Sequence, residues 1–584
     1  MTMHLHLAFI ALTSASTLTS QATTAQLLRD LKTGAQPDSL PSRFVENPRG
    51  DTWFTAYSDA SNTPQLFTSW GTDASTTRVT ALGALTFPGI VIADDWKAYF
   101  VGHDAAHGWE LWESDGSAQG TKLVSDLVPG PGSSLPKDLT VCAGALYHSA
   151  WHPNFGYELC RRGVQIADIA PGAASSHPSE FTRAGNNLYF VADDGITGRE
   201  LWVLPWRDPK NPNPKPRRVH DIRPGPLGSN PRSLVAFANV LYFTCDDGVH
   251  GRELWRSNGV GSGTTLVKDV DPGLGDGIPD GELVHSDLVL WFVGSTAAEG
   301  RELWRSSGYE NGTVIIADLR PGPASSEPRE LTPLHYDRIA FSADDGVHGR
   351  ELWWTQTVGS PTLHDLVPGP IGSDPRDLFW SSDDLYFAAT DAQHGTEIWS
   401  FESIEVRNVR LLLDLNPGVA SSRPPAGYAF GIADKNLIFR ADDGTSGIEP
   451  WVLDAGALSR RFGQGCGGES RMPRLASTPA RLGANVQFTG TGLQTTPSVA
   501  VVFASARPAF PFPLGSACRL QLDLGTLFTL TTRPASNTYN FILPIPSEAS
   551  FVGANLRVGA TVVPSSDPEF GFDLMNVVDL RLGR

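Results

Sequence analysis

The chain has 584 residues and a formal net charge of −18, which argues against a nucleic-acid partner. Gly (59) and Pro (44) are frequent, yet 40% of the residues are apolar and 16 are Trp. This composition is enough to build a core, so it argues against low-complexity disorder and favours many short strands joined by tight turns.

Residues 1–22 carry no charged side chain, and Leu5–Leu12 is an apolar run. Ser20-Gln21-Ala22 matches the small-x-small pattern before a cleavage site, so the segment is predicted to be a signal peptide. His4 and His6 stand where Lys or Arg is usual, and a disordered tail is the alternative. No later run is long enough for a transmembrane segment. We therefore expect a protein that is secreted or associated with the cell surface.

Residues 23–460 contain one repeated pattern, Leu-Tyr-Phe-x-Ala-Asp-Asp-Gly-x-x-Gly-Arg-Glu-Leu-Trp. It is nearly intact at Leu188–Trp202, Leu241–Trp255 and Ile339–Trp353, and looser copies bring the period to roughly 48 residues. A second half follows each Trp, and its fullest copy is Gly263–Val270 before Pro272-Gly273. Next come a Ser-Ser-x-Pro stretch and a short apolar run.

Each unit thus offers four short strands separated by turn signals, which is the size of one β-propeller blade. We count nine units and predict about nine blades, with eight possible if the degenerate first unit is used differently. A parallel β-helix is the second choice, because its coils are about half as long. The opening segment Leu28–Leu31 resembles the strand missing from the last repeat, so we expect the N-terminal strand to close the ring.

These residues resemble the bacterial family of secreted repeat proteins named for the signature Glu-Leu-Trp-x-x-Asp-Gly-Thr (ELWxxDGT), over roughly residues 27–455. The Asp-Gly-Thr part survives poorly, as in Asp115-Gly116-Ser117 and Asn258-Gly259-Val260. The resemblance implies secretion and a propeller-like fold, and it implies no defined activity.

Residues 461–584 are predicted to form a separate β-sandwich, because apolar strands alternate with Gly/Pro turns and the acidic excess ends near residue 460. The Gly463–Cys466 opening and the Pro513–Cys518 segment resemble a C-terminal module appended to many secreted bacterial repeat proteins. Export permits a disulfide between Cys466 and Cys518. With five cysteines, at least one thiol stays unpaired, and Cys245 is the favoured candidate.

Two kinds of repeated residue are interpreted as structural, because a catalytic constellation is asymmetric and these recur in almost every unit. The first is the Trp of Glu-Leu-Trp, expected to pack between neighbouring sheets, at Trp112, Trp202, Trp255, Trp304, Trp353, Trp399 and Trp451. The second is the Asp before Pro-Gly, at Asp126, Asp168, Asp221, Asp269, Asp318, Asp365 and Asp414.

Asymmetric features give only weak metal candidates. His148 and His152, in an off-pattern unit with Trp151 and Tyr157, could ligate a metal, but no third ligand is evident. Asp276 and Asp280 lie in a Gly/Asp-rich loop that could bind calcium. The Asp-Asp-Gly turns also invite a calcium hypothesis, although Asp side chains commonly accept backbone N–H groups in such turns. We expect no other cofactor.

No nucleophile elbow, HExxH, P-loop or GxGxxG motif is present, so no catalytic residue is predicted. The leading hypothesis is a monomeric, non-catalytic propeller that binds an extracellular protein or glycan. Two alternatives stay open. One is an enzyme acting on a polysaccharide or other polymer in the central funnel, and the other is a purely structural surface protein.

Overall fold

The computed structural model describes residues 25–453 except 34–37, 48, 60, 80–91, 95–96, 143, 206–213, 382–383, 403–407, 423–429 and 434–435; from 454 onward it describes only the strands. The predicted signal peptide lies outside the described residues. The chain divides into two compact units, Met1–Leu458 and Ser459–Arg584. Among the described residues, no helix is long and apolar enough to cross a membrane.

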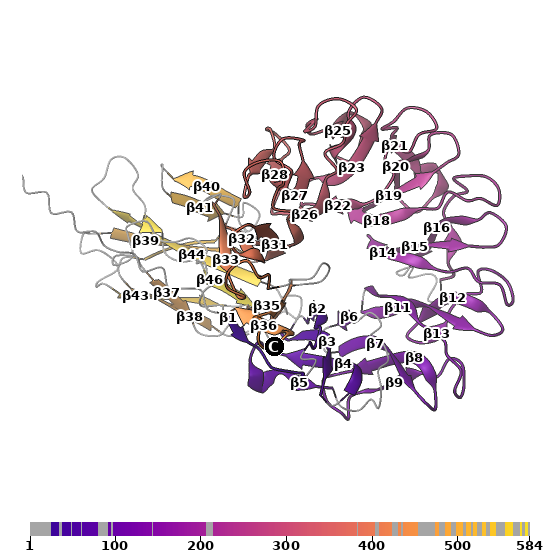
Figure 1. The fold of residues 1–584 in the computed structure, drawn as a ribbon, viewed down its shortest axis with the longest axis horizontal. Helices are drawn as coiled ribbons and strands as arrows, with labels where there is room; N and C mark the ends of the chain where they lie inside the picture. Colours follow the sequence, from indigo (N-terminus) through magenta and orange to yellow (C-terminus); the bar gives the residue numbers. More distant parts are fainter. Residues whose placement is uncertain are drawn as a thin grey trace, which may run out of the picture. The chain divides into compact units, whose positions relative to one another are not determined.

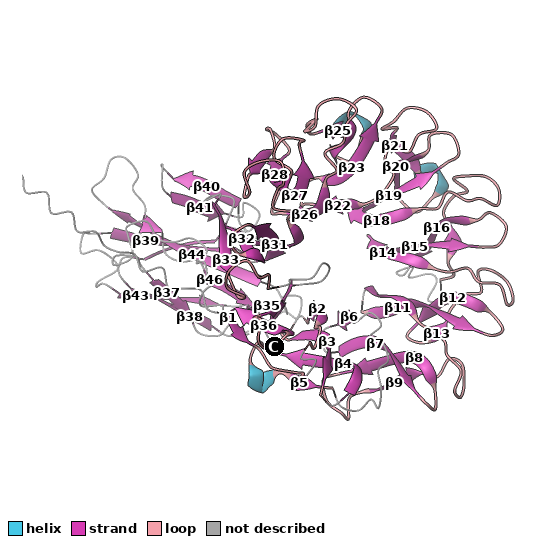
Figure 2. Ribbon diagram, in the orientation of Figure 1, coloured by secondary structure: helices cyan, strands magenta, loops and turns pink. Residues whose placement is uncertain are grey.

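The first unit is a nine-bladed β-propeller: nine antiparallel four-stranded sheets follow one another round a ring in Figures 1 and 2. The alternative count of eight is thereby excluded, because the degenerate first repeat forms a blade of its own.

The blades are numbered in chain order. Blade 1 is β2(Ser42–Glu46), β3(Thr52–Ser58), β4(Ser61–Ser69) and β5(Thr77–Arg78); blade 2 is β6(Ile92–Asp94), β7(Lys97–Asp104), β8(Gly108–Ser114) and β9(Lys122–Ser125); blade 3 is β10(Lys137–Cys142), β11(Ala145–His152), β12(Gly156–Arg161) and β13(Val164–Gln165). Blade 4 is β14(Ser179–Ala184), β15(Asn187–Asp193), β16(Arg199–Pro205) and β17(Arg217–Arg218); blade 5 is β18(Arg232–Phe237), β19(Val240–Asp246), β20(Arg252–Ser257) and β21(Thr265–Lys268); blade 6 is β22(Leu283–His285), β23(Leu290–Thr296), β24(Gly300–Ser306) and β25(Val314–Ile315). Blade 7 is β26(Arg329–Pro333), β27(Arg338–Asp344), β28(Arg350–Gln356) and β29(Thr362–His364); blade 8 is β30(Arg376–Ser381), β31(Asp384–Asp391), β32(Gly395–Glu402) and β33(Asn408–Leu413); blade 9 is β34(Phe430–Ala433), β35(Asn436–Asp442), β36(Ile448–Leu453) and, from the N-terminus, β1(Ala25–Leu27). Three single-turn 3₁₀ helices occur among the described residues: η1(Asp73–Ser75), η2(Gly261–Gly263) and η3(Glu310–Gly312).

The ring is closed by the N-terminal strand, as predicted. β1 pairs with β36 in the register Ala25↔Leu453 to Leu27↔Trp451. The closing strand is Ala25–Leu27 and not Leu28–Leu31: the latter residues form the following loop, in which the Leu28 and Leu31 N–H groups bond to Pro450 O and a Glu449 oxygen. Closure covers the edge of β36 and gives the last blade four strands like the others.

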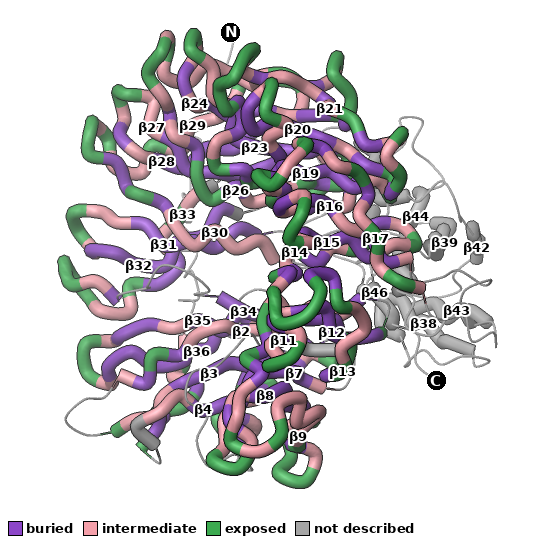
Figure 3. Tube along the Cα trace, turned by 90° about the vertical axis from the view of Figure 1, so that its right-hand side faces the viewer, coloured by how far each residue is buried: buried purple, intermediate pink, exposed green. Residues whose placement is uncertain are grey.

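The core lies between neighbouring blades, and Figure 3 shows buried strands between exposed loop ends. Phe190, Phe243 and Phe341 on the second strands have no exposed surface. Trp255 is 9% exposed and packs on Tyr189 and Leu201 of blade 4, so it joins two sheets. Both faces of the middle strands are apolar because each blade is covered on both sides by its neighbours.

The strands of the second unit form three sheets. One is β37(Arg474–Ser477), β38(Asn485–Thr491) and β43(Thr538–Pro544); the second is β42(Phe528–Thr532), β39(Ser498–Ser505), β44(Asn555–Pro564) and β45(Asp573–Leu574), with β46(Val578–Arg581) also pairing with β44; the third is β40(Phe510–Leu514) with β41(Cys518–Leu522). This is an all-β unit, and the sandwich arrangement stays a prediction. The predicted disulfide lies outside the described residues, since neither Cys466 nor the side chain of Cys518 is described.

Candidate ligand-binding surface

The Glu of Glu-Leu-Trp holds the loop between consecutive blades. Glu200 has no exposed surface, and its two oxygens accept the N–H groups of Ile222, Arg223 and Ser229 at 2.9–3.3 Å. The Ser229 hydroxyl donates to the same carboxylate at 2.6 Å. Equivalent buried glutamates are found in blades 2–9, at Glu110, Glu158, Glu200, Glu253, Glu302, Glu351, Glu397 and Glu449.

Burial raises the pKa of these carboxyl groups, and hydrogen bonding opposes the rise. The pKa reaches about 8 in Glu253, which accepts N–H groups from Val270 and Gly277, and about 8 in Glu449. In Glu449 one oxygen is buried with no hydrogen-bond partner. These glutamates face the interior of the blades and not a ligand, so their role is structural.

The Asp-Asp-Gly turns are held by their own carboxylates. Asp193 accepts the N–H of Gly195 at 2.8 Å, while Asp194 accepts those of Ile196 and Thr197 at 2.9 and 2.8 Å. In two of these turns, and in the corresponding turns of blades 2 and 8, a histidine side chain bonds to the turn Asp, as in the pair His250–Asp247 at 2.7 Å. Neighbouring carboxylates are therefore occupied by backbone donors and do not converge on one point.

The repeated Asp before Pro-Gly also serves a turn. An oxygen of Asp126, Asp168 and Asp318 accepts the N–H of the glycine four residues later, at 3.0–3.3 Å. The repeated Trp residues other than Trp202, which is half-buried, are 7–9% exposed. Both sets recur around the ring.

The four metal candidates are held apart. Burial lowers the pKa of His148 to about 4, and its Nε2 accepts the Gly163 N–H at 3.0 Å. His152 lies four strand residues away, about 13 Å along β11. Asp276 accepts the Arg252 N–H at 2.8 Å, and Asp280 forms an ion pair with Arg301. Within the described ranges, no group of three or more His, Cys, Asp or Glu side chains is arranged to hold a metal.

One face of the propeller, here called the turn face, carries the turns between second and third strands and the loops that enter the blades. The two are joined by hydrogen bonds such as Asp193 N to Ser176 O (2.9 Å) and Asn230 N to Arg199 O (3.0 Å). Each of blades 2–9 presents there one cross-strand pair, here called the turn-face pair, immediately next to the buried Glu. In blades 4, 5 and 7 this pair is an Asp and an Arg: Asp193–Arg199, Asp246–Arg252 and Asp344–Arg350.

Blades 2 and 3 replace this charged pair with aromatic side chains. The pair is His103–Trp109 in blade 2, with ring centroids 5.2 Å apart, and Trp151–Tyr157 in blade 3. All four side chains are half-buried, so part of each is open to solvent. We call these four residues the aromatic sector. Blades 6, 8 and 9 carry Ser295–Arg301, Thr390–Thr396 and Asp442–Ile448 at this position, so among these pairs the fully aromatic ones are confined to two adjacent blades. Such asymmetry is what a specific ligand site requires.

Tyr157 of the aromatic sector is fixed by its neighbours. The His177 ring stacks on it with centroids 5.4 Å apart, and Lys137 Nζ lies 4.5 Å from its centroid. His177 and Lys137 are exposed, so they add two polar donors to the edge of the aromatic sector. Aromatic faces flanked by donors are what sugar rings and peptides bind.

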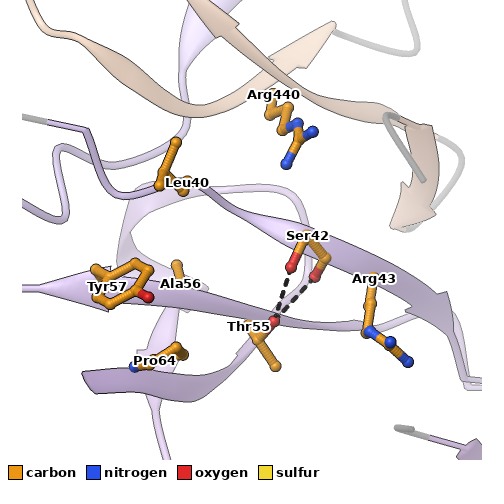
Figure 4. Close-up of a pocket in the computed structure, with 8 residues that line it drawn as sticks. All are labelled: Leu40, Ser42, Arg43, Thr55, Ala56, Tyr57, Pro64 and Arg440. Carbon is orange, nitrogen blue, oxygen red and sulfur yellow. Dashed lines mark hydrogen bonds between the residues drawn. The ribbon is translucent and has the colours of Figure 1, made fainter. Parts of the chain in front are cut away.

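A pocket of about 220 Å³ lies in the seam between blades 9 and 1, shown in Figure 4. Its apolar wall includes Leu40, Tyr57 and Pro64, and its polar lining is Ser42, Arg43, Thr55 and Arg440. Tyr57 occupies the place of Asp193 in blade 4, because its N–H bonds to Ser39 O as that of Asp193 bonds to Ser176 O.

The sequence signalled only part of this surface. Trp151 and Tyr157 stood out as departures from the Asp-Asp-Gly turn, but His103 and Trp109 did not. Comparing, unit by unit, the residue before the Glu of Glu-Leu-Trp, or before Gln65 in blade 1, would have identified Trp109 and Pro64. The approach of Arg440 to blade 1 had no sequence signal, since it depends on closure of the ring.

Comparisons with known proteins leave the function open. No family model matches the chain, and no curated protein matches it. Similar solved structures include puromycin hydrolase (14% identity, TM-score 0.34, covering 62% of this chain and 59% of that one). They also include the WD40 β-propeller domain of Doa1 (14%, 0.23, 50% and 87%) and TolB from Acinetobacter baumannii (10%, 0.24, 55% and 79%). The chain spans about three-fifths of the puromycin hydrolase, and these scores are too low to carry a functional argument.

Proposed function

We propose that the protein is a non-catalytic binding propeller that holds an extracellular glycan on the turn face, across the aromatic sector of blades 2 and 3. The observation that carries the proposal is the replacement of the Asp–Arg pair by His103–Trp109 and Trp151–Tyr157. The location outside the cell rests on the N-terminal segment and on the resemblance to the ELWxxDGT repeat family.

A glycan is favoured over a charged protein surface by the chemistry of the aromatic sector. Trp and Tyr rings offer flat apolar area to the C–H face of a sugar ring and keep a polar edge for hydroxyl groups. The charges that would steer a basic or acidic protein lie instead in the Asp–Arg pairs of other blades. There the Arg is engaged: Arg252 Nη1 donates to Asn230 O and Thr244 O at 3.0 and 3.3 Å.

Binding without turnover is supported by how the repeated acids are used. The glutamates of blades 2–9 are buried and accept hydrogen bonds from loops, and the turn aspartates accept backbone N–H groups. Neither set offers a pair of carboxylates facing a shared open space, which glycoside hydrolysis requires.

Affinity gel electrophoresis against a panel of soluble polysaccharides tests the proposal. We expect at least one polysaccharide to retard the wild type and to keep its chain length during incubation. The double variant Trp151→Asp/Tyr157→Arg gives blade 3 the pair that blades 4, 5 and 7 carry, so it should fold and lose about tenfold or more in affinity. Trp70→Ala is the matched control, because Trp70 is 45% exposed and lies beyond the third strand of blade 1, away from the turn face. Equal retardation of wild type and double variant would refute the assignment, as would a panel in which nothing binds.

A further inference from the structure

The pocket between blades 9 and 1 corresponds to a space that an arginine fills in other blades. In blade 7, Arg350 Nη1 donates to Glu327 O at 2.9 Å and to the Ser342 hydroxyl at 3.3 Å. Arg252 of blade 5 contacts Asn230 O and the Thr244 hydroxyl in the same way, at 3.0 and 3.4 Å. The arginine side chain thus bonds both to the second strand and to the residue before the proline at the start of the blade.

Blade 1 has no arginine at this position. The pairing Ala56↔Gln65 places Pro64 where blades 5 and 7 carry Arg, while Thr55 stands where they carry Thr244 and Ser342. Leu40, which precedes Pro41, stands where Glu327 stands in blade 7. The pocket is therefore the space of one absent side chain, walled by Tyr57 and Pro64.

A guanidinium from the other side of the seam enters this space. Arg440 on β35 donates from Nη1 to Pro41 O at 3.1 Å, and Figure 4 shows its side chain directed toward Ser42 and Thr55. Its Nε is buried and has no hydrogen-bond partner. Burial lowers the pKa of Arg440, and the charge of Asp377 on blade 8 acts the other way. Arg440 pairs across the strands with the residue before the Trp of its blade. In blades 5 and 7 the residues that pair in the same way are Thr244 and Ser342.

The lining has a positive balance. It includes Arg43 and Arg440 and no acidic residue, and Ser42 and Thr55 satisfy each other through hydroxyls 3.0 Å apart. A planar guanidinium that lines a pocket without acidic residues suits a carboxylate, which it can bind through two parallel N–H groups. The volume of about 220 Å³ is below the roughly 300–1,000 Å³ of pockets for drug-sized ligands, so it fits one sugar residue.

We propose that this pocket binds the carboxylate of a uronic acid residue, so that the glycan bound by the propeller is an acidic one. The inference deepens the proposed function and rests on it. The guanidinium of Arg440 holds the carboxylate, Tyr57 and Pro64 contact the ring, and the rest of the chain continues toward the aromatic sector.

The test compares three uronic acid polymers, polygalacturonate, alginate and hyaluronan, with their carboxyl-reduced counterparts by isothermal titration calorimetry. We expect the wild type to bind at least one acidic polymer at least tenfold more tightly than its reduced form. Arg440→Ser should abolish this preference while it leaves the thermal midpoint close to wild type, since Ser occupies the equivalent position in blade 7. Arg305→Ser, on the third strand of blade 6, is the matched control and should keep the preference.

The outcomes separate this inference from the proposed function. Equal binding of acidic and reduced polymers by the wild type, with binding lost in Trp151→Asp/Tyr157→Arg, overturns the anion pocket and leaves glycan binding standing. A preference for the acidic polymer that survives Arg440→Ser also overturns it. Absence of binding to all six polymers and to the wider polysaccharide panel overturns both.

Discussion

Removing one blade glutamate should destabilise the propeller far more than removing an exposed glutamate of the same blade. Glu302 has no exposed surface and accepts the N–H of Leu319 at 3.2 Å and the N–H and hydroxyl of Ser326 at 2.9 and 2.6 Å. Glu302→Ala leaves these three donors without an acceptor, and both Ser326 donors are buried. At about 1–3 kcal/mol for each unsatisfied buried donor, the two Ser326 donors alone account for about 2–6 kcal/mol. Relief of the buried charge, which raises the pKa of Glu302, offsets part of it, so we expect about 3 kcal/mol.

The assay is urea unfolding followed by Trp fluorescence, with thermal unfolding as a second probe. Glu310→Ala is the control, because Glu310 is exposed in η3 of the same blade and its loss should cost under about 0.5 kcal/mol. Glu302→Gln keeps the shape and one acceptor, as Gln65 does in blade 1, and should cost less than Glu302→Ala. Ser326→Ala should be non-additive with Glu302→Ala, since the two share a hydrogen bond. If Glu302→Ala and Glu310→Ala unfold at the same urea concentration, the loop-holding role is wrong.

Three further predictions concern stability. Trp255→Ala should cost about 3–5 kcal/mol in urea unfolding through lost burial and a cavity, whereas Trp255→Phe should cost much less; an unchanged midpoint for Trp255→Ala would show that it is not a core residue. Burial raises the pKa of Glu253 and Glu449 to about 8 and of Glu397 to about 7, from an ordinary 4.5, so the stability that they contribute is present below 4.5 and is lost as the pH rises through 7–8. The thermal midpoint should therefore decrease as the pH is raised from 6.5 to 8.5. His148, whose pKa is lowered to about 4, raises stability with pH only below this range. A midpoint that increases from pH 6.5 to 8.5 would contradict the assignment. Peptide mapping without reduction should recover Cys466 linked to Cys518, a disulfide that stabilises the folded state by roughly 3–4 kcal/mol. Two free thiols in exported protein would refute this disulfide.

Much of the fold follows from the repeat itself. Turn signals and period-two alternation predict four strands in each unit, and counting units predicts the nine blades of the structure. The closing strand was expected at Leu28–Leu31 and lies at Ala25–Leu27, because Asp30 and Leu31 correspond to Asp269 and Val270, which follow the outer strand of blade 5 and do not belong to it.

The functional surface was harder to predict, for two physical reasons. Repetition of the Glu in Glu-Leu-Trp indicates a structural role, but its partners are loop N–H groups distant in sequence, 29 residues away for Glu200 with Ser229 and 418 for Glu449 with Leu31. The Arg440 pocket joins residues about 400 apart in sequence, as the bond from Arg440 to Pro41 shows. Only the closed ring brings these residues together, so no local sequence pattern predicts their contact.

Hydrogen–deuterium exchange with a bound polysaccharide tests the central claim most directly, because it shows where on the ring the ligand lies. The account predicts protection at the turns between β7 and β8 and between β11 and β12, and no change at the turn between β27 and β28, which carries the Asp344–Arg350 pair. Protection confined to the opposite face, at the turns after the third strands where Trp70 and η3 lie, would contradict it.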